Sequence, residues 1–325
     1  MCSPQTLVSA GTMFVAPTRK GSMHATRITT ELRPVVETLL ERHLSNAHEW
    51  FPHEYVPWER SCEHGGEESW GDDLSLAPAA RIALTVNLLT EDNLPLYFAE
   101  LTRLGVGGPW AEWTRRWTAE EGRHSIVIRD YLMVTRAIDP VELERARMRQ
   151  VCAGSVPAFD DVTDALVYTT LQELATRISH RNTGKLLVDA TGVTIMNRVA
   201  ADENLHHLFY RDLASAAIDL APSDMVRAID RVVRNFSMPG TDIADFASHA
   251  RTMAKAGVYS LAIHHDQILV PIVLQRWGLA DLRGLDDSAE RARERVLRYI
   301  NRLAKVSRRL DSRMREDAEK QPVSM

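Results

Sequence analysis

The sequence predicts an all-α fold, and two observations support this prediction. From residue 31 onward, apolar residues recur at spacings of three and four, which is the pattern of an amphipathic helix. The strict alternation that indicates a half-buried strand is hard to find. The periodic stretches predict helices over about 31–47, 76–104, 109–136, 140–150, 163–182, 193–216, 222–236, 242–256, 261–277 and 287–318.

Glycine and proline predict where these helices end. Three clusters of these residues separate neighbouring helices, at 105–109, 154–157 and 238–240. Within the helix expected over 76–104, Pro95 cannot donate a hydrogen bond to the carbonyl of Glu91, so we expect a kink there. No break has the composition of a flexible linker, and we expect one domain over 29–318.

Composition narrows the class of protein. The chain has 325 residues, of which 45% are hydrophobic and 26% charged, so it can bury a large core and is not a disordered protein. No uncharged apolar run is long enough to span a bilayer. Three cysteines are too few for a disulfide framework, which favours a reducing compartment, and we expect a cytoplasmic protein. The net charge of −5 argues against a general nucleic-acid binder.

Both ends of the chain lack the helical pattern. The first 30 residues contain no Asp or Glu, and we expect residues 1–28 to form a disordered leader. A transit peptide is the alternative, and Met23 is a candidate initiator. We expect residues 319–325 to form a C-terminal tail.

The chain contains two Glu-x-x-His pairs, Glu121 with His124 and Glu203 with His206. A Glu three residues before a His puts both side chains on one helix face, where they can reach one metal ion. Each pair has another glutamate thirty residues upstream, Glu91 and Glu173. The two sets therefore form a repeat with an offset of 82 residues, as between Glu121 and Glu203.

A spacing of thirty residues fits a helical hairpin, with about 12 residues of helix, a loop of about six and about 12 residues of return. Two such hairpins would form a four-helix bundle with four carboxylates and two imidazoles inside. Burying four ionised carboxylates costs several kcal/mol each, and two divalent cations would cancel their charge. Oxygen and imidazole ligands favour iron, with manganese as the other candidate. A solvated Glu and an ordinary buried His would be the simpler interpretation of one pair alone.

Four segments around these residues resemble the signature blocks of the soluble acyl-acyl-carrier-protein desaturases, most closely the actinobacterial branch. They are residues 90–95, 117–124, 172–183 and 201–206. The blocks follow the family's order, and the resemblance extends over about residues 30–280. It implies a ferritin-like homodimer whose di-iron centre uses O₂ to insert a cis double bond into a saturated chain on acyl carrier protein.

The resemblance also implies roles for individual residues. The metal ligands would be Glu91, Glu121, His124, Glu173, Glu203 and His206. Glu121 and Glu203 would bridge the two ions. Thr176 would assist oxygen activation, and Asp202 with Trp50 would carry electrons to His124. The simpler alternatives are a hydroxyl bonded to the helix backbone for Thr176 and core packing for Trp50. A ferredoxin-like donor is implied, because no glycine motif for flavin or nicotinamide is present.

The sequence departs from the family pattern at two positions. Gly122 and Ser125 stand where members often have Asn and Gly. Gly122 should cost its helix about 1 kcal/mol relative to Ala. The effect of these two residues on activity stays open, as do the chain length, the double-bond position and the identity of the donor and carrier.

Other classes of protein stay open from the sequence. A ferritin-like iron-oxidising or storage protein could use the same ligands, and a helical scaffold would need none of them. A ribonucleotide reductase subunit is disfavoured, because Ile128 stands where that class places a Tyr. An acidic carrier needs a basic docking face, and two helical stripes are candidates. The first is Arg227, Arg231 and Arg234, and the second is Arg291, Arg295, Arg298, Arg302 and Lys305.

Overall fold

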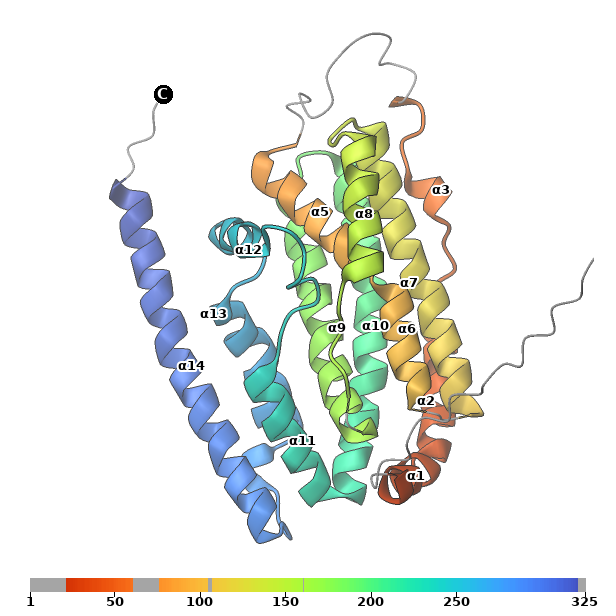
Figure 1. Cartoon of the computed structure of the whole chain (residues 1–325), viewed down its shortest axis with the longest axis vertical. Coiled ribbons are helices and arrows are strands. Elements are labelled where there is room, and N and C mark those ends of the chain that lie inside the picture. Colours follow the sequence, from red (N-terminus) through yellow and green to blue (C-terminus); the bar gives the residue numbers. More distant parts are fainter. Residues whose placement is uncertain (1–21, 61–75, 105–106, 160, 321–325) are drawn as a thin grey trace, which may run out of the picture.

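The computed structural model describes residues 22–60, 76–104, 107–159 and 161–320, which form helices and contain no strand (Figure 1). The predicted all-α fold is confirmed. A central bundle consists of α5 (Pro78–Glu91), α7 (Pro109–Val134), α9 (Val162–Gly184) and α10 (Ala190–Leu220). Around the bundle, α5 packs on α7, α7 on α10, α10 on α9 and α9 on α5.

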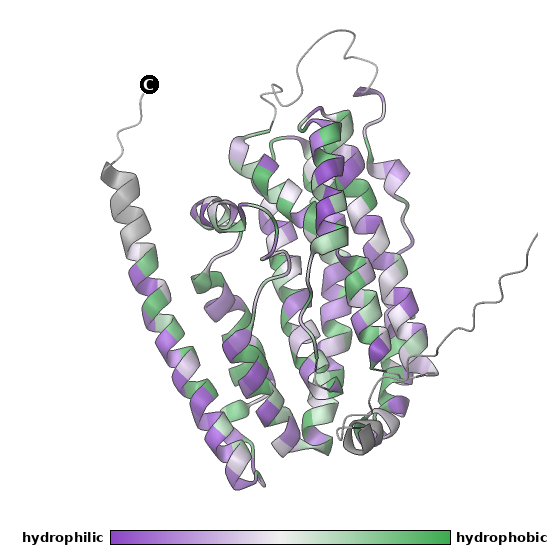
Figure 2. Ribbon diagram, in the orientation of Figure 1, coloured by the Kyte–Doolittle hydropathy of each residue, from purple (hydrophilic) through white to green (hydrophobic). Residues whose placement is uncertain are grey.

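Further helices cover this bundle. They are α1 (Ser22–Glu31), α2 (Arg33–Asn46), α3 (Pro52–Tyr55), α6 (Leu94–Arg103), α8 (Pro140–Ala153), α11 (Pro222–Asn235), α12 (Phe246–Lys255), α13 (Leu261–His264), the π-helix η1 (His265–Arg276), the short η2 (Leu279–Asp281) and α14 (Asp287–Lys320). Helix α2 packs against α7 and α10, while α11 and α14 pack together on the other side of the bundle. Figure 2 shows hydrophobic and hydrophilic residues interspersed along α14, where Ala292, Val296 and Ile300 are buried and Arg291, Arg298 and Arg302 are exposed.

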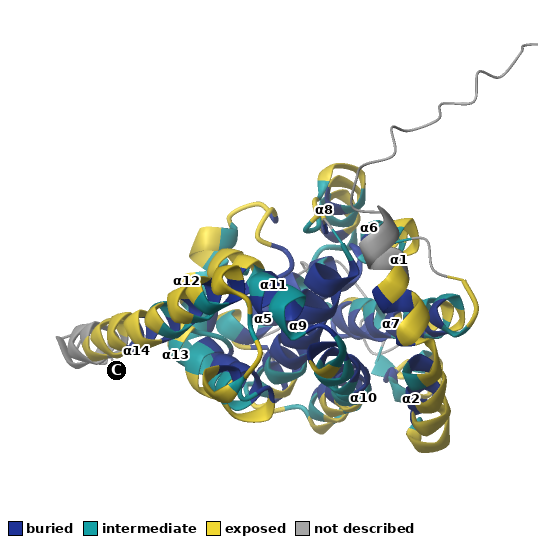
Figure 3. Cartoon of the chain, turned by 90° about the horizontal axis from the view of Figure 1, so that it is seen from below, coloured by how far each residue is buried: buried dark blue, intermediate teal, exposed yellow. Residues whose placement is uncertain are grey.

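Helix α9 is the most enclosed element. Every residue from Val162 to Thr176 is buried, and Figure 3 shows buried ribbon gathered in the middle of the molecule. A buried helix cannot leave its first N–H groups to water. At the start of α9, the Asp161 side chain accepts a hydrogen bond from the backbone N–H of Thr163 at 2.7 Å. Asp189 caps α10 in the same way, so both helices of the second hairpin begin at an aspartate cap.

The predicted helix over 76–104 is wrong as a single element. Helix α5 ends at Glu91, a turn follows, and α6 begins at Leu94. Pro95 lies in the first turn of α6, where its missing N–H costs nothing. The expected kink is therefore a complete break, and it leaves Glu91 as the last residue of its helix.

Four other expectations need correction. Residues 22–28, expected in the leader, belong to α1, while residues 1–21 lie outside the described residues. The helix predicted over 242–256 begins only at Phe246. Most of the stretch 261–277 is the π-helix η1, which contains Pro271, and a proline removes a hydrogen bond that an α-helix needs. Helix α14 reaches Lys320, two residues into the expected tail, of which residues 321–325 lie outside the described part.

No helix among the described residues is both long enough and apolar enough to cross a membrane.

Candidate metal centre

The structure brings the six predicted ligands together in the middle of the bundle. They come from four helices: Glu91 from α5, Glu121 and His124 from α7, Glu173 from α9, and Glu203 and His206 from α10. All six are buried, and the exposed fraction is 7% for Glu91 and 0% for Glu173. The ligand atoms form two groups whose members lie within 4.8 Å of one another.

Two carboxylates belong to both groups. The first group is Glu91, Glu121, His124 and Glu203, and the second is Glu121, Glu173, Glu203 and His206. Glu121 directs one oxygen to each side, with Oε2 lying 3.1 Å from His124 Nδ1 and Oε1 lying 2.7 Å from His206 Nδ1. This is the placement expected of a carboxylate that bridges two ions.

Three atoms of the second group have no hydrogen-bond partner among the described residues. They are His206 Nδ1, Glu121 Oε1 and Glu173 Oε2, and all three are buried. His206 Nδ1 and Glu121 Oε1 are close but do not have hydrogen-bond geometry. Buried polar atoms without partners are costly, and a cation bound between them would satisfy all three. The residues therefore fit a metal ion at this point.

The pKa values in the site are shifted by burial and by the charges of neighbouring side chains. Burial, together with the charge of Glu203, raises the pKa of Glu121 and that of Glu173. Burial alone would lower the pKa of His124, but the neighbouring Glu121 raises it well above its usual value. Burial likewise opposes ionisation of Glu91, yet contacts with His124 and His180 lower its pKa. Divalent cations would supply the positive charge that protonated imidazoles otherwise provide.

Trp50 and Asp202 lie together beside His124. The indole Nε1–H of Trp50 donates to Asp202 Oδ2 at 2.8 Å, and the same oxygen lies 3.5 Å from His124 Nε2. The rings of Trp50 and His124 are stacked with centroids 6.5 Å apart. The guanidinium of Arg123 also donates to Asp202, at 2.9 Å.

Thr176 contacts Glu203, one of the candidate ligands, directly. Its hydroxyl lies 2.8 Å from Glu203 Oε2 and 3.1 Å from the carbonyl of Glu173. The backbone bond is the one expected from the simpler interpretation, and the contact with Glu203 is additional. Nearby, Trp117 Nε1–H donates to Glu173 Oε1 at 3.0 Å.

The sequence interpretation missed His180. Its Nε2 lies 2.8 Å from Glu91 Oε1 and 3.5 Å from Glu203 Oε1. Burial lowers its pKa, but hydrogen bonds to Glu203 and Glu91 outweigh this and raise the pKa to about 9. Its position seven residues after Glu173, on the same face of α9, was the available signal.

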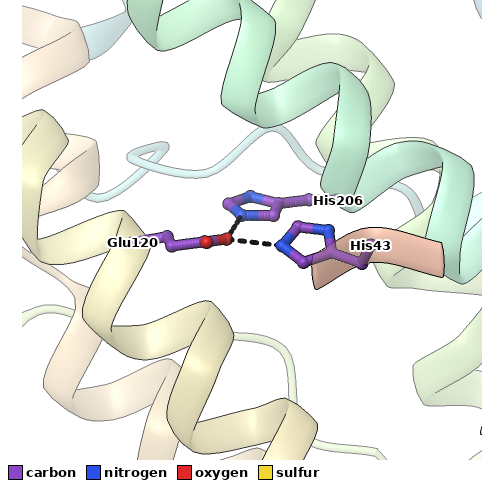
Figure 4. A group of neighbouring side chains, drawn as sticks. All are labelled: His43, Glu120 and His206. Carbon is purple, nitrogen blue, oxygen red and sulfur yellow. Dashed lines mark hydrogen bonds and ion pairs between the residues drawn. The ribbon is translucent and has the colours of Figure 1, made fainter. Parts of the chain in front are cut away.

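Glu120 and His43 were also missed. Glu120 Oε2 lies 2.9 Å from His206 Nε2 and 2.9 Å from His43 Nε2 (Figure 4). The other ring nitrogen of His206, Nδ1, is the one that faces Glu173. These three residues could hold an ion by composition. The direct hydrogen bonds leave no space for one between them, so we assign the group as a hydrogen-bonded support of His206.

A cavity of about 60 Å³ borders the site at the break after α5. Its polar wall consists of Asn87, Thr90, Glu91, Thr176, Ser179 and His180. Its apolar wall includes Met238, Phe246, Met253 and Tyr259. A larger apolar cavity of about 320 Å³ lies between α6, α7, α9 and α10, and none of the six ligand candidates lines it.

Residues 24–325 match the family described as fatty acid desaturase. The chain belongs to this family. The chain is 41% identical to the Mycobacterium tuberculosis protein named as acyl-acyl-carrier-protein desaturase DesA1, over 84% of each chain. It is 30% identical to the chloroplastic acyl-acyl-carrier-protein desaturase 3 of Oryza sativa, over 84% of this chain and 72% of the relative. The solved structure of the M. tuberculosis acyl-ACP desaturase DesA2 matches with a TM-score of 0.65 and 27% identity, over 82% of this chain and 99% of that one.

These comparisons confirm the resemblance to the desaturases and to their actinobacterial members. They also agree with the ferritin-like helical architecture that the resemblance implied.

Proposed function

We propose that this desaturase uses O₂ and two iron ions to insert a cis double bond into a saturated acyl chain attached to acyl carrier protein. The observation that carries the proposal is the pair of buried four-residue groups that share Glu121 and Glu203. The names of the relatives support the substrate, because those proteins are named as acyl-acyl-carrier-protein desaturases.

The six residues would hold the two ions. When bound, the ions would supply the activation of O₂ that is needed to remove hydrogen from an unactivated methylene. The protein keeps the site dry, since five of the six residues are at most 5% exposed. A dry site strengthens electrostatic interactions and excludes side reactions with water.

The cavity beside Glu91 is the proposed place of the reacting methylenes. Its apolar wall suits an acyl chain, and its polar wall contains Glu91 and Thr176. The Thr176 hydroxyl donates to Glu203 and lies on the cavity wall, so it is placed to hold a proton between the carboxylate and the bound chain. Trp50 and Asp202 form the proposed route for electrons from a ferredoxin-like donor to His124.

The two basic stripes that could bind an acidic carrier differ in their ion pairs. On α11, Arg227 pairs with Asp286 and Arg231 with Asp164, both at 2.7 Å, and Arg234 pairs with Asp230. That stripe is largely neutralised. On α14, Arg295 pairs with Asp230 and Arg298 with Glu294. The other three members, Arg291, Arg302 and Lys305, are exposed and have no ion pair among the described residues, so we propose α14 as the carrier-binding face. Charge reversal of Arg302 and Lys305 should then raise KM for the carrier-bound substrate, and more at low salt.

The function is tested with iron-loaded protein, a reduced ferredoxin, O₂ and carrier-bound acyl chains. Chains of about 16 to 24 carbons are supplied, because the fold alone does not determine the chain length of the substrate. Mass spectrometry should find a product that has lost two hydrogens. Glu203→Gln should abolish both iron uptake and product, while Glu37→Gln on the exposed face of α2 should change neither. Absence of product from every chain length, or full activity of Glu203→Gln, would contradict the proposal.

A further inference from the structure

We infer that Glu120 and His43 are positioning residues that hold His206 in the orientation and tautomer in which its Nδ1 can bind a metal ion. The inference rests on the proposed function, since it concerns one ligand of the proposed centre. It assigns a role to two buried residues on the side of the site opposite the substrate cavity.

Glu120 is held from three directions. Its Oε2 accepts the Nε2–H of His206 and the Nε2–H of His43, each at 2.9 Å (Figure 4). Its Oε1 accepts the Nε–H of Arg116 at 2.6 Å. The exposed fraction of Glu120 is only 3% and that of His43 is 4%. With both oxygens engaged, the carboxylate cannot rotate away from His206.

The hydrogen bond decides the tautomer of His206. A carboxylate accepts but does not donate, so Nε2 of His206 must carry the proton. The lone pair of the ring is then at Nδ1, which faces Glu121 Oε1 and Glu173 Oε2. A carboxylate behind a metal-binding histidine orients the ring and raises its basicity, with an effect on metal affinity of about 10- to 100-fold.

The internal repeat of the chain supports this role. Glu120 and Asp202 are separated by the same 82 residues as Glu121 and Glu203. Each of the two carboxylates pairs with an arginine four residues before it, Arg116 and Arg198. The repeat therefore includes the residues behind the ligands as well as the ligands.

The two copies support each other's histidine. Asp202 on α10 faces the Nε2 of His124 on α7, and Glu120 on α7 faces the Nε2 of His206 on α10. His43 completes the second copy as Trp50 completes the first. Trp50 donates to Asp202 and stacks on His124, while His43 donates to Glu120 and stacks on His206 with ring centroids 5.8 Å apart.

His43 can be reached from the surface. A hollow of about 230 Å³ between α2 and α10 is lined by His43 together with Leu39, Arg42, Leu208 and Phe209. Shortening His43 to Gly would extend this hollow to Glu120. A small imidazole could then enter and replace the missing ring.

The test measures stepwise binding of Fe²⁺ without O₂, and assigns each ion by anomalous scattering from crystals grown at limiting iron. Glu120→Ala and His43→Phe should weaken the ion beside His206 by about 10- to 100-fold and leave the ion beside His124 within about threefold. Trp50→Phe is the matched control and should weaken only the ion beside His124. His43→Gln keeps a donor for Glu120 and should stay close to wild type.

Added imidazole should restore the affinity of His43→Gly to within about threefold of wild type, which a general loss of folding would not allow. Wild-type affinity at both positions in Glu120→Ala, or an equal loss at both, would overturn this inference while the proposed function stands. A wild-type chain that binds no pair of ions would overturn both.

Discussion

The two helical hairpins that build the site share a ligand spacing but differ in construction. In the second hairpin, α9 and α10 are continuous, each begins at an aspartate cap, and Glu173 lies within the fully buried stretch from Val162 to Thr176. In the first hairpin, α5 ends at Glu91, a break separates it from α6, and a cavity borders Glu91. We therefore propose that the second hairpin anchors the centre and that the first leaves room for a substrate.

The largest expected effect on iron binding comes from replacing Glu91 or Glu173, the carboxylates that belong to only one of the two groups. Glu173→Ala should weaken iron binding more than 100-fold, because no water can replace a ligand that is fully buried. Glu91→Ala should weaken it less, because the adjoining cavity can admit a water ligand. Binding isotherms for Fe²⁺ compare the two. Equal losses would mean that the hairpins do not differ as described.

The cap of α10 should be the next most sensitive feature. Asp189 accepts N–H bonds at the helix start, a bond from the Tyr131 hydroxyl at 2.9 Å and a paired bond from Arg60. Asp189→Ala should lower the free energy of unfolding by about 2 kcal/mol, whereas Asp189→Asn should keep the cap and lose less. Denaturant unfolding measures both, and an unchanged midpoint for the Ala variant would contradict the anchor role.

The same variant has a predicted pH dependence. The Arg60 guanidinium, with help from the Tyr131 hydroxyl and against partial burial, lowers the pKa of Asp189 to about 2 from a usual value of 3.8. A carboxyl whose pKa is lowered by folding stabilises the folded state fully at pH values above its usual pKa. This stabilisation is lost as the pH falls toward the pKa of the folded state. The stability difference between wild type and Asp189→Ala should therefore be constant near neutral pH and shrink between about pH 4 and pH 2. A difference that grows in acid would contradict this assignment.

A smaller effect is expected at the turn beside the cavity. Gly240 has φ of +83°, and a Cβ there would lie 2.7 Å from Thr90 Oγ1. Gly240→Ala should lower the free energy of unfolding by about 1 to 2 kcal/mol and raise KM, because Thr90 lines the cavity. Gly257 also has a positive φ but has open space around it, so Gly257→Ala is the control for backbone strain alone. Equal KM values in the two variants would remove the argument from Thr90.

The smallest effect is expected in α7. A Cβ added at Gly122 would meet no atom within 4 Å. Gly122→Ala should therefore raise the free energy of unfolding by about 0.5 to 1 kcal/mol and leave activity unchanged. A loss of activity without a loss of stability would show that the departure from the family pattern at this position has a role in the reaction.

The clustering of the six candidate ligands could be predicted from the sequence because their geometry is local. Glu and His at a spacing of three share a helix face whatever the rest of the fold does, and the repeat with Glu91 and Glu173 supplied the pairing. His43 could not be predicted, because its contact with Glu120 depends on how α2 crosses α7 and α10. Tertiary packing of this kind leaves no periodic signal.

The errors in the fold have the same origin. Pro95 is compatible with either a kinked helix or two separate helices. The packing of α6 on α7 favours two separate helices, and the sequence does not show this packing. The π-helix at 265–276 has the same apolar spacing as an α-helix over short stretches, so periodicity could not separate the two.

The most direct test of the central claim is anomalous diffraction from wild-type crystals loaded with iron. We predict two iron peaks in each chain, both in contact with Glu121 and Glu203, one beside His124 and the other beside His206. A single peak, no peak, or two peaks that do not share these carboxylates would contradict the account.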